Sequence, residues 1–332
     1  MFPLDRCIGE SAGREARGVE LRILVTGGAG FIGSNLCRTL RQADQMNEVV
    51  VFDDFSTGHW GNLIGLDVET IEGSILDATL VMSSFKGVDA VVHLAARASV
   101  PRSISNPRAT HDVNVTGTLN VLEAAREVGA HVISASSSSV YGSNPQLPKV
   151  ESMATRPMSP YAATKLATET YTLSWGQSFN LDVLAFRFFN VYGPGQSAGH
   201  VYAAVVPTFL DAALRGKSIQ IHGSGEQTRD FTYIDTVCGV INDALMSRIS
   251  SVEPMNLALG TRTSIKELVA LISAITNLPL QVEHSPERVG EVPHSSADPS
   301  KLHALFPSAH LYSLEAGLAN TFDWMRQSSG YR

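Results

Sequence analysis

The feature that most constrains the fold is the alternation, through the first half of the chain, of short apolar runs with segments of helical periodicity. Helical patterns occupy NLCRTLRQA, residues 106–128 and residues 160–177. The runs that predict strands are LRILVTG, EVVVFDD, VETIEG, DAVVHLAA, HVISASS and LDVLAFR. Nearly continuous apolar strands joined by helices are typical of a parallel sheet covered on both faces. The sequence therefore predicts an α/β fold with a doubly wound parallel sheet.

A glycine-rich turn follows the first predicted strand. ILVTGGAGFIGSNL places Gly28, Gly30 and Gly33 in the GxGxxG spacing, which lets backbone amides approach a pyrophosphate at a helix N-terminus. Asp53 follows Gly33 by twenty residues, where a carboxylate accepts hydrogen bonds from a ribose 2′-hydroxyl and repels a 2′-phosphate. These residues predict a Rossmann-type site for NAD rather than NADP. Asp54 is either a ligand contact or a plain turn residue.

The rhythm of strands and helices changes after residue 187. We expect residues 1–20 to form a mobile extension, because they mix charges and glycines and lack a signal-peptide core. Residues 21–187, with a returning segment near 231–250, are expected to form the NAD-binding domain. Residues 188–230 and 251–332 are expected to form a smaller α/β substrate lobe.

Charge and composition exclude several classes of function. The formal net charge of −7 argues against a general binder of nucleic acid or anionic membranes, and no apolar run approaches the ~20 residues needed to cross a bilayer. The histidines are scattered, and Cys7, Cys37 and Cys238 share no metal-ligand spacing, so we predict no metal. Cys37 and Cys238 are expected to be buried thiols in a reducing cytoplasm.

A second chemical motif, SPYAATKLATE, places Tyr161 and Lys165 on one face of a helix. A tyrosine normally titrates near about pH 10, and a neighbouring ammonium and a nicotinamide cation both favour the phenolate. The pair predicts a general base that removes a proton from a substrate hydroxyl. Between the two motifs, Ser136 to Ser139 end an apolar strand at the sheet edge where open α/β folds keep their ligands.

Seven segments together resemble the extended short-chain dehydrogenase/reductases, and within them the nucleotide-sugar 4-epimerases. They are TGGAGFIGSNL, VVHLAARASVPRS, NVTGTLNVLEAA, SSSSVYG, SPYAATK, RFFNVYGPGQ and GSGEQTRDF. The similarity runs from about residue 21 to the C-terminus. It implies a UDP-sugar substrate, NAD as cofactor, a cytoplasmic enzyme, and a homodimer formed through helices near residues 107–128 and 160–178.

The resemblance also implies roles for individual residues. The catalytic serine of the family lies four positions before the tyrosine of the VYG element, which makes it Ser137, acting with Tyr161 and Lys165. Ser138 is the alternative, whereas Ser136 and Ser139 are expected to bond local backbone. Further cofactor-binding positions are Gly27, Phe31, Ile32, Ser56, Gly58, Ser74, Ile75, Leu94, Ala95, Ala96, Asn114 and Phe188. Further substrate-binding positions are Ser99, Asn190, Arg229, Arg288, Glu291 and Ser295.

The residues after Ser137 bear on the reaction type. Dehydratases that resemble this chain carry Asp-Glu there, because expelling water needs an additional acid and base, and related UDP-glucuronate decarboxylases carry a glutamate where Ser139 stands. Hydroxyl groups at Ser138 and Ser139 favour a redox-neutral epimerisation. A dehydratase or reductase of the same superfamily is the alternative enzyme, and an NAD-sensing module without the catalytic residues is the non-enzymatic one.

Three departures from the family pattern are Ser74, Arg97 and Phe188, the last of which stands beside the expected nicotinamide where a tyrosine is frequent. Ser74 stands where many relatives carry an aspartate, which puts an adenine contact in doubt. Arg97 replaces a residue that is usually neutral, and it either touches the substrate or pairs with an acid. Ser295 stands where galactose-restricted relatives carry a bulky tyrosine. A small residue there leaves room for an N-acetyl group, so we expect activity on UDP-N-acetylglucosamine and UDP-N-acetylgalactosamine as well as on UDP-glucose and UDP-galactose.

Overall fold

The computed structural model describes residues 21–198, 204–286 and 292–328, and its core is a seven-stranded sheet in which every neighbouring pair is parallel. The sheet order is β11–β6–β5–β4–β1–β2–β3. The strands are β1 (Arg22–Thr26), β2 (Glu48–Asp53), β3 (Glu69–Glu72), β4 (Ala90–His93), β5 (His131–Ser137), β6 (Val183–Phe188) and β11 (Met255–Leu257). The chain order reverses between β1 and β4, which opens a crevice at the carboxyl ends of these strands. The predicted doubly wound α/β fold is confirmed.

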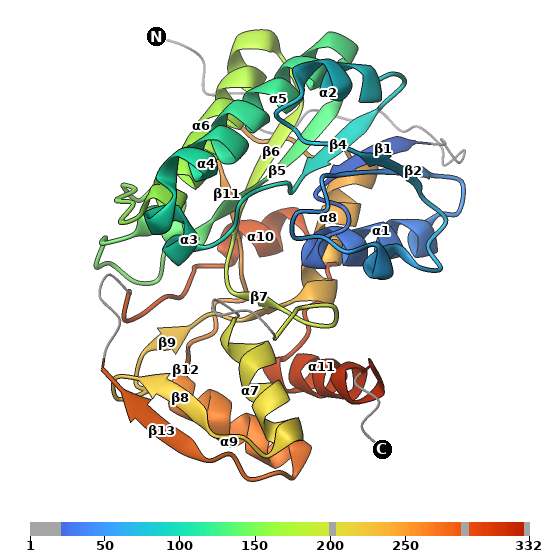
Figure 1. Cartoon of the computed structure of the whole chain (residues 1–332). Coiled ribbons are helices and arrows are strands. Elements are labelled where there is room, and N and C mark those ends of the chain that lie inside the picture. The colour runs from blue at the N-terminus through green and yellow to red at the C-terminus, as the bar shows by residue number, and fades with distance from the viewer. Residues whose placement is uncertain (1–20, 199–203, 287–291, 329–332) are drawn as a thin grey trace.

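Helices cover both faces of this sheet because successive side chains of each strand point to opposite sides. Ile23 and Val25 of β1 pack with Leu36 in one core, whereas Leu24 packs with Val121 in the other. The first face carries α1 (Phe31–Ala43) and α8 (Ile234–Met246), and the second carries α2 (Ala78–Ser84), α5 (Gly117–Val128) and α6 (Pro160–Phe179) (Figure 1). Both faces of the sheet are therefore dry, and polar side chains gather at the strand ends.

The helix predicted over residues 106–128 contains a π-helical turn. It consists of α4 (Pro107–His111), a π-helical turn η2 (Asp112–Thr116) and α5, and it follows the short α3 (Val100–Ser105). The Asn106 side chain caps α4 by accepting from the Ala109 amide at 3.1 Å, and a proline suits the first helical position. The prediction of helix is confirmed, and the apolar periodicity does not reveal the wider turn inside it.

The second half of the chain builds a smaller lobe below the sheet in the view of Figure 1. Its paired strands are β7 (Val191–Tyr192) with β10 (Thr232–Tyr233), β9 (Thr228–Arg229) with β12 (Thr263–Ser264), and β8 (Ile219–His222) with β13 (Val282–Ser285). Its helices are α7 (Val205–Arg215), α9 (Ile265–Thr276), α10 (Ser300–Leu305) and α11 (Leu314–Ser328). The strand β11 pairs with β6 in the large sheet, so the expected start of the lobe at residue 251 is displaced past this strand. The strand is only three residues long, too short for a periodic pattern.

The structure bears on the predicted buried cysteines and on the predicted lack of a membrane-spanning segment. Cys37 and Cys238 are buried free thiols, as predicted, and burial raises the pKa of Cys37 to about 12. Within the ranges that the structure describes, no helix is long and apolar enough to cross a membrane. Cys7 and the expected extension over residues 1–20 lie outside the described residues.

Candidate active site

A cavity of about 780 Å³ opens at the carboxyl ends of the central strands. The glycine turn, the ends of β2, β4 and β5, and the start of α6 all contribute to its wall, although they come from distant parts of the sequence. The predicted site residues that line it are Gly27, Gly30, Phe31, Ile32, Gly33, Asp53, Asp54, Ser56, Ile75, Leu94, Ala95, Ala96, Ser137, Tyr161, Lys165, Phe188 and Asn190. The fold therefore brings the glycine motif and the Ser-Tyr-Lys set to one place.

The glycine turn is shaped by contacts that leave no room for side chains. Gly27 has a φ of +72°, and a Cβ atom on it would lie 2.8 Å from the Ala95 amide nitrogen. A Cβ atom on Gly33 would lie 2.3 Å from the Gly27 carbonyl oxygen. The N-cap of α1 is Gly30, which offers no side-chain hydrogen bond to the first turn. Amides of that turn are thus left for an anion at the helix N-terminus.

Asp53 ends β2 beside this turn and is held by two backbone amides. Its carboxylate accepts from Ala29 at 2.9 Å and from Phe55 at 2.8 Å. Burial raises the pKa of Asp53, and the two amide hydrogen bonds oppose part of the rise. Asp54 both caps a turn, by accepting from the Ser56 amide at 2.9 Å, and lines the cavity, so the two alternatives for it are compatible. The turn and the carboxylate fit the pyrophosphate and ribose of a dinucleotide.

The start of α6 sets the position of the tyrosine and the lysine. Ser159 caps the helix by accepting from the Ala162 amide at 3.1 Å, and Pro160 occupies its first position. Lys165 is buried and donates from Nζ to the Ala135 carbonyl oxygen of β5 at 2.8 Å. Burial lowers the pKa of Lys165 to about 8, so this ammonium is far less firmly protonated than an exposed one.

Tyr161 and Ser137 are directly coupled. Burial raises the pKa of Tyr161, and a hydrogen bond with the Ser137 side chain opposes part of that rise. We expected Lys165 to favour the phenolate of Tyr161. In the structure, burial has the larger effect on the Tyr161 pKa and favours the neutral phenol. The Ser137 hydroxyl therefore favours the phenolate of Tyr161, against the effect of burial.

The other serines of the cluster behave differently from expectation. Ser136 was expected to bond local backbone, but its hydroxyl donates to Glu169 Oε2 at 2.7 Å on α6. The buried Ser139 hydroxyl has no hydrogen-bond partner among the described residues. Ser136 lies on β5 beneath α6, whereas Ser139 lies in the 3-10 turn η3 (Ser138–Tyr141) that follows the strand.

Several predicted residues lie outside the cavity wall and serve the surrounding structure. Asn114 accepts from the Arg97 amide at 2.7 Å and donates to the Thr164 hydroxyl at 2.9 Å. The Ser99 hydroxyl caps α3, and the Ser74 hydroxyl accepts from the Leu76 amide. Gly28, Gly58 and Ser138 are likewise absent from the residues that line the cavity. Contacts of these six with a ligand stay predictions.

A second cavity of about 300 Å³ adjoins the first, and Asn190 lines both. Asn190 donates from Nδ2 to the Asp230 carbonyl oxygen at 3.0 Å, and Arg229 contributes its side chain to the wall. Ser295 bonds through its amide to the Thr228 carbonyl oxygen at 3.0 Å and lies beside this wall without being part of it. Arg288 and Glu291 lie outside the described residues.

Sequence reasoning missed a further set of lining residues. In the first cavity they include Thr57, His59, Arg102 and Val113, and in the second Val206, Phe209, Gln220, His222, Gln227 and Phe231. His59 directly follows the STG segment, which is a signal that could have found it. These residues of the second cavity come from α7, from β8 and from the loops beside β9 and β10. No local pattern in the sequence marks them as neighbours.

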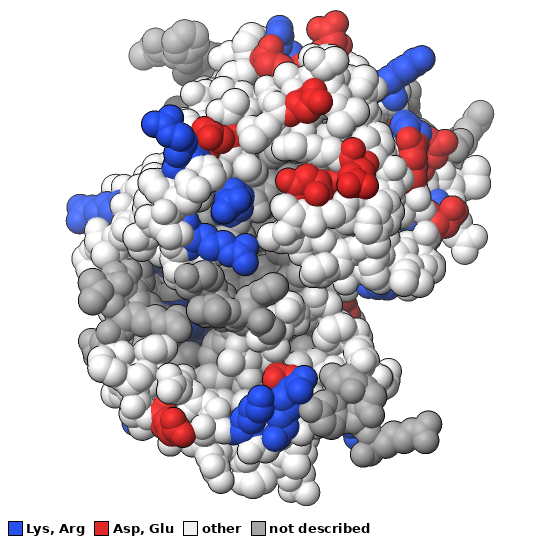
Figure 2. Space-filling view, in the orientation of Figure 1, with Lys and Arg blue, Asp and Glu red and all other residues white. Residues whose placement is uncertain are grey.

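Arg97 has an environment that decides between the two alternatives left open for it. Its side chain lines the first cavity, as does that of Arg102. Among the described residues, neither guanidinium has an acid partner. Figure 2 shows basic side chains beside the hollow that separates the upper and lower parts of the molecule. Arg97 is thus available to a bound ligand rather than committed to an acid.

The sequence model of the NAD dependent epimerase/dehydratase family matches residues 23–258. The chain belongs to this family. It is 36% identical over 317 residues to a UDP-glucose 4-epimerase of Mycolicibacterium smegmatis, covering 93% of this chain and 100% of that one. A UDP-N-acetylglucosamine 4-epimerase from Methanobrevibacter ruminantium, solved with UDP-N-acetylmuramic acid, superposes with a TM-score of 0.87 at 36% identity, covering 93% and 99% of the two chains.

Relatives with other reactions are nearly as similar. A dTDP-glucose 4,6-dehydratase of Mycobacterium tuberculosis is 30% identical, covering 94% of this chain and 95% of its own. A probable UDP-glucuronate 4-epimerase of Rhizobium meliloti is 31% identical.

A UDP-glucose 4-epimerase of Thermus thermophilus, 32% identical with a TM-score of 0.83, was solved with NAD. NAD is the cofactor, and no group of three or more His, Cys, Asp or Glu side chains in the described ranges could hold a metal ion.

Proposed function

We propose that this protein catalyses the NAD-dependent 4-epimerisation of a UDP-hexose. The observation that carries the proposal is the convergence of Ser137, Tyr161 and Lys165 on one wall of the cavity that the glycine turn and Asp53 also line. Two of the similar proteins reported above are named as 4-epimerases of UDP-glucose and UDP-N-acetylglucosamine.

The chain's own residues have distinct tasks in this reaction. Bound in the cavity that the glycine turn and Asp53 line, NAD would supply reversible hydride acceptance at the sugar C4. Tyr161 takes the proton of the 4-hydroxyl, relayed through the Ser137 hydroxyl, and gives it back after the 4-keto sugar has turned over. Lys165 keeps a positive charge near the tyrosine and donates to the Ala135 carbonyl. Sheet and helix hold these groups still while the ring rotates.

The scarcity of acidic side chains among the described residues that line the first cavity favours epimerisation over elimination. Of the described lining residues only Asp53 and Asp54 are acidic; Asp53 ends β2 and Asp54 directly follows it. Elimination of water needs an acid and a base beside the hexose, and Ser138 and Ser139 offer hydroxyls in their place. A dehydratase or reductase of the same family is therefore the less favoured alternative.

The second cavity is the proposed site of the uridine diphosphate. Phe209 and Phe231 provide apolar surface for a base, and Gln220 and Gln227 provide amides. Asn190 and Arg229 stand where phosphates would pass between the two cavities, and a guanidinium fork suits phosphate oxygens. We further propose that Arg288 and Glu291 contact the phosphates and the uridine ribose.

The small residue Ser295 supports acceptance of N-acetylhexosamines as well as hexoses. A tyrosine there would fill the space that an N-acetyl group needs. Ser295→Tyr is expected to lower kcat/KM for UDP-N-acetylglucosamine by about tenfold or more while leaving UDP-glucose nearly unchanged. If the variant handles both substrates as the wild type does, the residue that limits the 2-substituent lies elsewhere.

A UDP-hexuronate is a second candidate substrate, favoured by Arg97 and Arg102. Two guanidinium groups without an acid partner among the described residues line the cavity that also holds Tyr161. A carboxylate on the hexose would pair with such groups. Replacing both arginines by glutamine should then lower kcat/KM for UDP-glucuronate far more than for UDP-glucose. Equal losses for both substrates would assign the arginines to phosphates instead.

The proposed function is tested by incubating the protein and NAD with a panel of UDP-sugars and identifying products by NMR. We expect the 4-epimer of each accepted sugar and no accumulation of reduced cofactor. A released keto product or a dehydrated sugar would show another member of the family's reactions. We also propose that the enzyme is a cytoplasmic homodimer, for which light scattering should give twice the mass of one chain.

A further inference from the structure

One face of α6 contacts three consecutive residues at the end of β5. Tyr161, Lys165 and Glu169 follow one another at four-residue spacing on this face. Tyr161 bonds with Ser137, Lys165 with the Ala135 carbonyl, and Glu169 with the Ser136 hydroxyl. The first two contacts belong to the catalytic groups. The third lies a full turn deeper in the protein.

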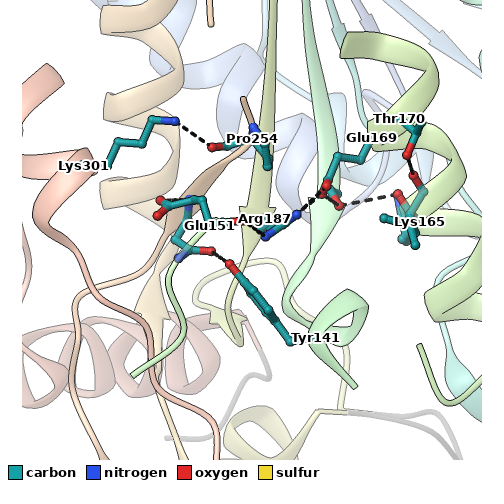
Figure 3. A network of polar contacts seen from close by, with 11 residues as sticks. Tyr141, Glu151, Lys165, Glu169, Thr170, Arg187, Pro254 and Lys301 are labelled. Atoms are coloured by element: carbon teal, nitrogen blue, oxygen red, sulfur yellow. Dashed lines mark hydrogen bonds and ion pairs between the residues drawn. The ribbon is translucent and has the colours of Figure 1, made fainter. Parts of the chain in front are cut away.

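Glu169 is held on its other side by an arginine of the neighbouring strand. Arg187 of β6 donates from Nε to Oε2 at 2.9 Å and from Nη2 to Oε1 at 2.6 Å, a two-pronged ion pair. Both side chains are only 4% exposed. Burial by itself lowers the pKa of Arg187, but the hydrogen bonds and charge of Glu169 raise it above its usual value. Figure 3 shows the two side chains pointing at each other, with Lys165 on the adjoining turn of α6.

The arginine is fixed in turn by the sheet and by a tyrosine. Ser136 and Arg187 are direct partners in the parallel register of β5 and β6, so their side chains rise side by side on one face. The Arg187 guanidinium lies 4.7 Å from the centre of the Tyr141 ring and donates to the Glu151 carbonyl at 3.1 Å. The Tyr141 hydroxyl donates to Asn256 at 2.6 Å. The ion pair is therefore anchored in rigid elements.

We propose that Glu169 and Arg187 are positioning residues, which lock the register of α6 against β5 and so hold Tyr161 and Lys165 over Ser137. This inference rests on the proposed function and adds two residues to it. Neither side chain lines either cavity, so we assign both a positioning role rather than a catalytic one.

The chemistry of the pair explains why it would serve register more than stability. A buried ion pair gains little net stability, because desolvating the two charges offsets most of their attraction. Its geometry is nevertheless demanding, since a guanidinium fork and a carboxylate fit only when helix and strand are aligned. A shift of about 1 Å at the reacting atoms can cost roughly a hundredfold in rate.

The test compares kcat and KM for the epimerisation in matched variants, after the wild type has established that the reaction occurs. Glu169→Gln and Arg187→Lys keep hydrogen-bonding groups but lose the two-pronged pair. We expect kcat to fall by about 30- to 100-fold in each while KM and NAD affinity change by less than about threefold. Ser136→Ala, which removes only the link to β5, should lower kcat by a smaller factor.

Thr172→Ala serves as the matched control. Thr172 is fully buried on α6, and its hydroxyl bonds only to the Thr168 carbonyl of the same helix. This variant should lose stability without losing kcat. A double change, Glu169→Leu with Arg187→Met, removes the buried charges and is expected to fold while kcat stays low.

Several results would overturn the inference. They are wild-type kcat in folded Glu169→Gln or Arg187→Lys protein, a Thr172→Ala loss of kcat equal to theirs at equal stability, or recovery of kcat in the double variant. If the wild type lacks epimerase activity altogether, the proposed function fails first, and the two failures are distinguished.

Discussion

Two buried carboxylates organise the two halves of the site by different means. Glu169 lies where α6 meets the central sheet and is balanced by the Arg187 cation. Asp230 lies where the smaller lobe meets the sheet-bearing domain and is fully buried, and the hydrogen bonds that its carboxylate accepts from the described residues all come from neutral groups. The first joins elements that must stay in register, and the second gathers loops that must stay together.

Asp230 is surrounded by neutral donors. Oδ1 accepts from the Leu259 amide at 3.3 Å and from the Thr261 hydroxyl at 3.1 Å, and Oδ2 accepts from the amides of Gly260 and Ala297 at 3.0 and 3.1 Å. Burial raises the pKa of Asp230 to about 6, although all four hydrogen bonds act to lower it. Four hydrogen bonds to one carboxylate thus hold residues 259–261 and Ala297 against the segment that carries Asp230. Arg229 directly precedes Asp230 in that segment.

The comparison indicates how catalysis and substrate binding are divided. Changes along the contact between α6 and β5 should lower kcat, because they displace the side chains that act at the reacting carbon. Changes around Asp230 should affect KM, because they move Arg229 and Asn190, which line the second cavity.

The largest effect is expected at Tyr161, at the end of the contact between α6 and β5 that faces the substrate. Tyr161→Phe removes the acid-base hydroxyl and its bond with Ser137, and should lower kcat by at least about a hundredfold with NAD still bound. Turnover and co-purified cofactor measure the two quantities. Near-normal turnover in a folded variant would remove the tyrosine from the mechanism.

A second effect concerns stability and its pH dependence. The pKa of Lys165 falls from 10.5 to about 8 on burial, so its protonated form is disfavoured in the folded protein. Stability from this group is present above pH 10.5 and is lost as the pH falls through about 8. Lys165→Met should therefore be inactive yet more stable at pH 7, by about 2 kcal/mol after the lost hydrogen bond is allowed for.

Urea unfolding of the cofactor-free protein measures this difference. The advantage of Lys165→Met should be full below about pH 8 and should shrink as the pH approaches 10.5. An advantage that does not depend on pH would mean that the lysine ammonium is solvated in the folded protein.

The smallest effect is expected at the Asp230 junction. Asp230→Asn replaces one of two oxygens that each accept from two donors, so two of the four donors lose their acceptor. We expect the KM for a UDP-sugar to rise about tenfold, the equivalent of about 1.4 kcal/mol, while kcat changes by less than about threefold. Steady-state kinetics separate the two constants. A fall in kcat with an unchanged KM would contradict the division between the halves.

The fold and the cofactor were largely predictable from local pattern. The apolar strands, the glycine turn and the carboxylate at the end of β2 each carry their signal within a few residues. The spacing of Tyr161 and Lys165 is equally local, since residues four apart share a helix face. The break at Asn106 and Pro107 was visible too, whereas the π turn that follows leaves the apolar periodicity intact.

The positioning contacts were not predictable, because they depend on register between distant segments. Nothing in YAATKLATE shows that Glu169 meets an arginine from the next strand of the sheet. The four donors of Asp230 come from two loops that are far from it in sequence. The short strand β11 and the wall of the second cavity share this property, since their residues become neighbours only after the sheet has formed.

The most direct test of the central claim follows the hydrogen at C4 of the sugar. UDP-galactose deuterated at C4 is incubated in ordinary water with the protein and NAD, and the product is examined by NMR and mass spectrometry. Direct removal and return of the C4 hydride predicts UDP-glucose that still carries deuterium at C4. Deuterium lost to the solvent, or found at C6 of a dehydrated sugar, would contradict the account.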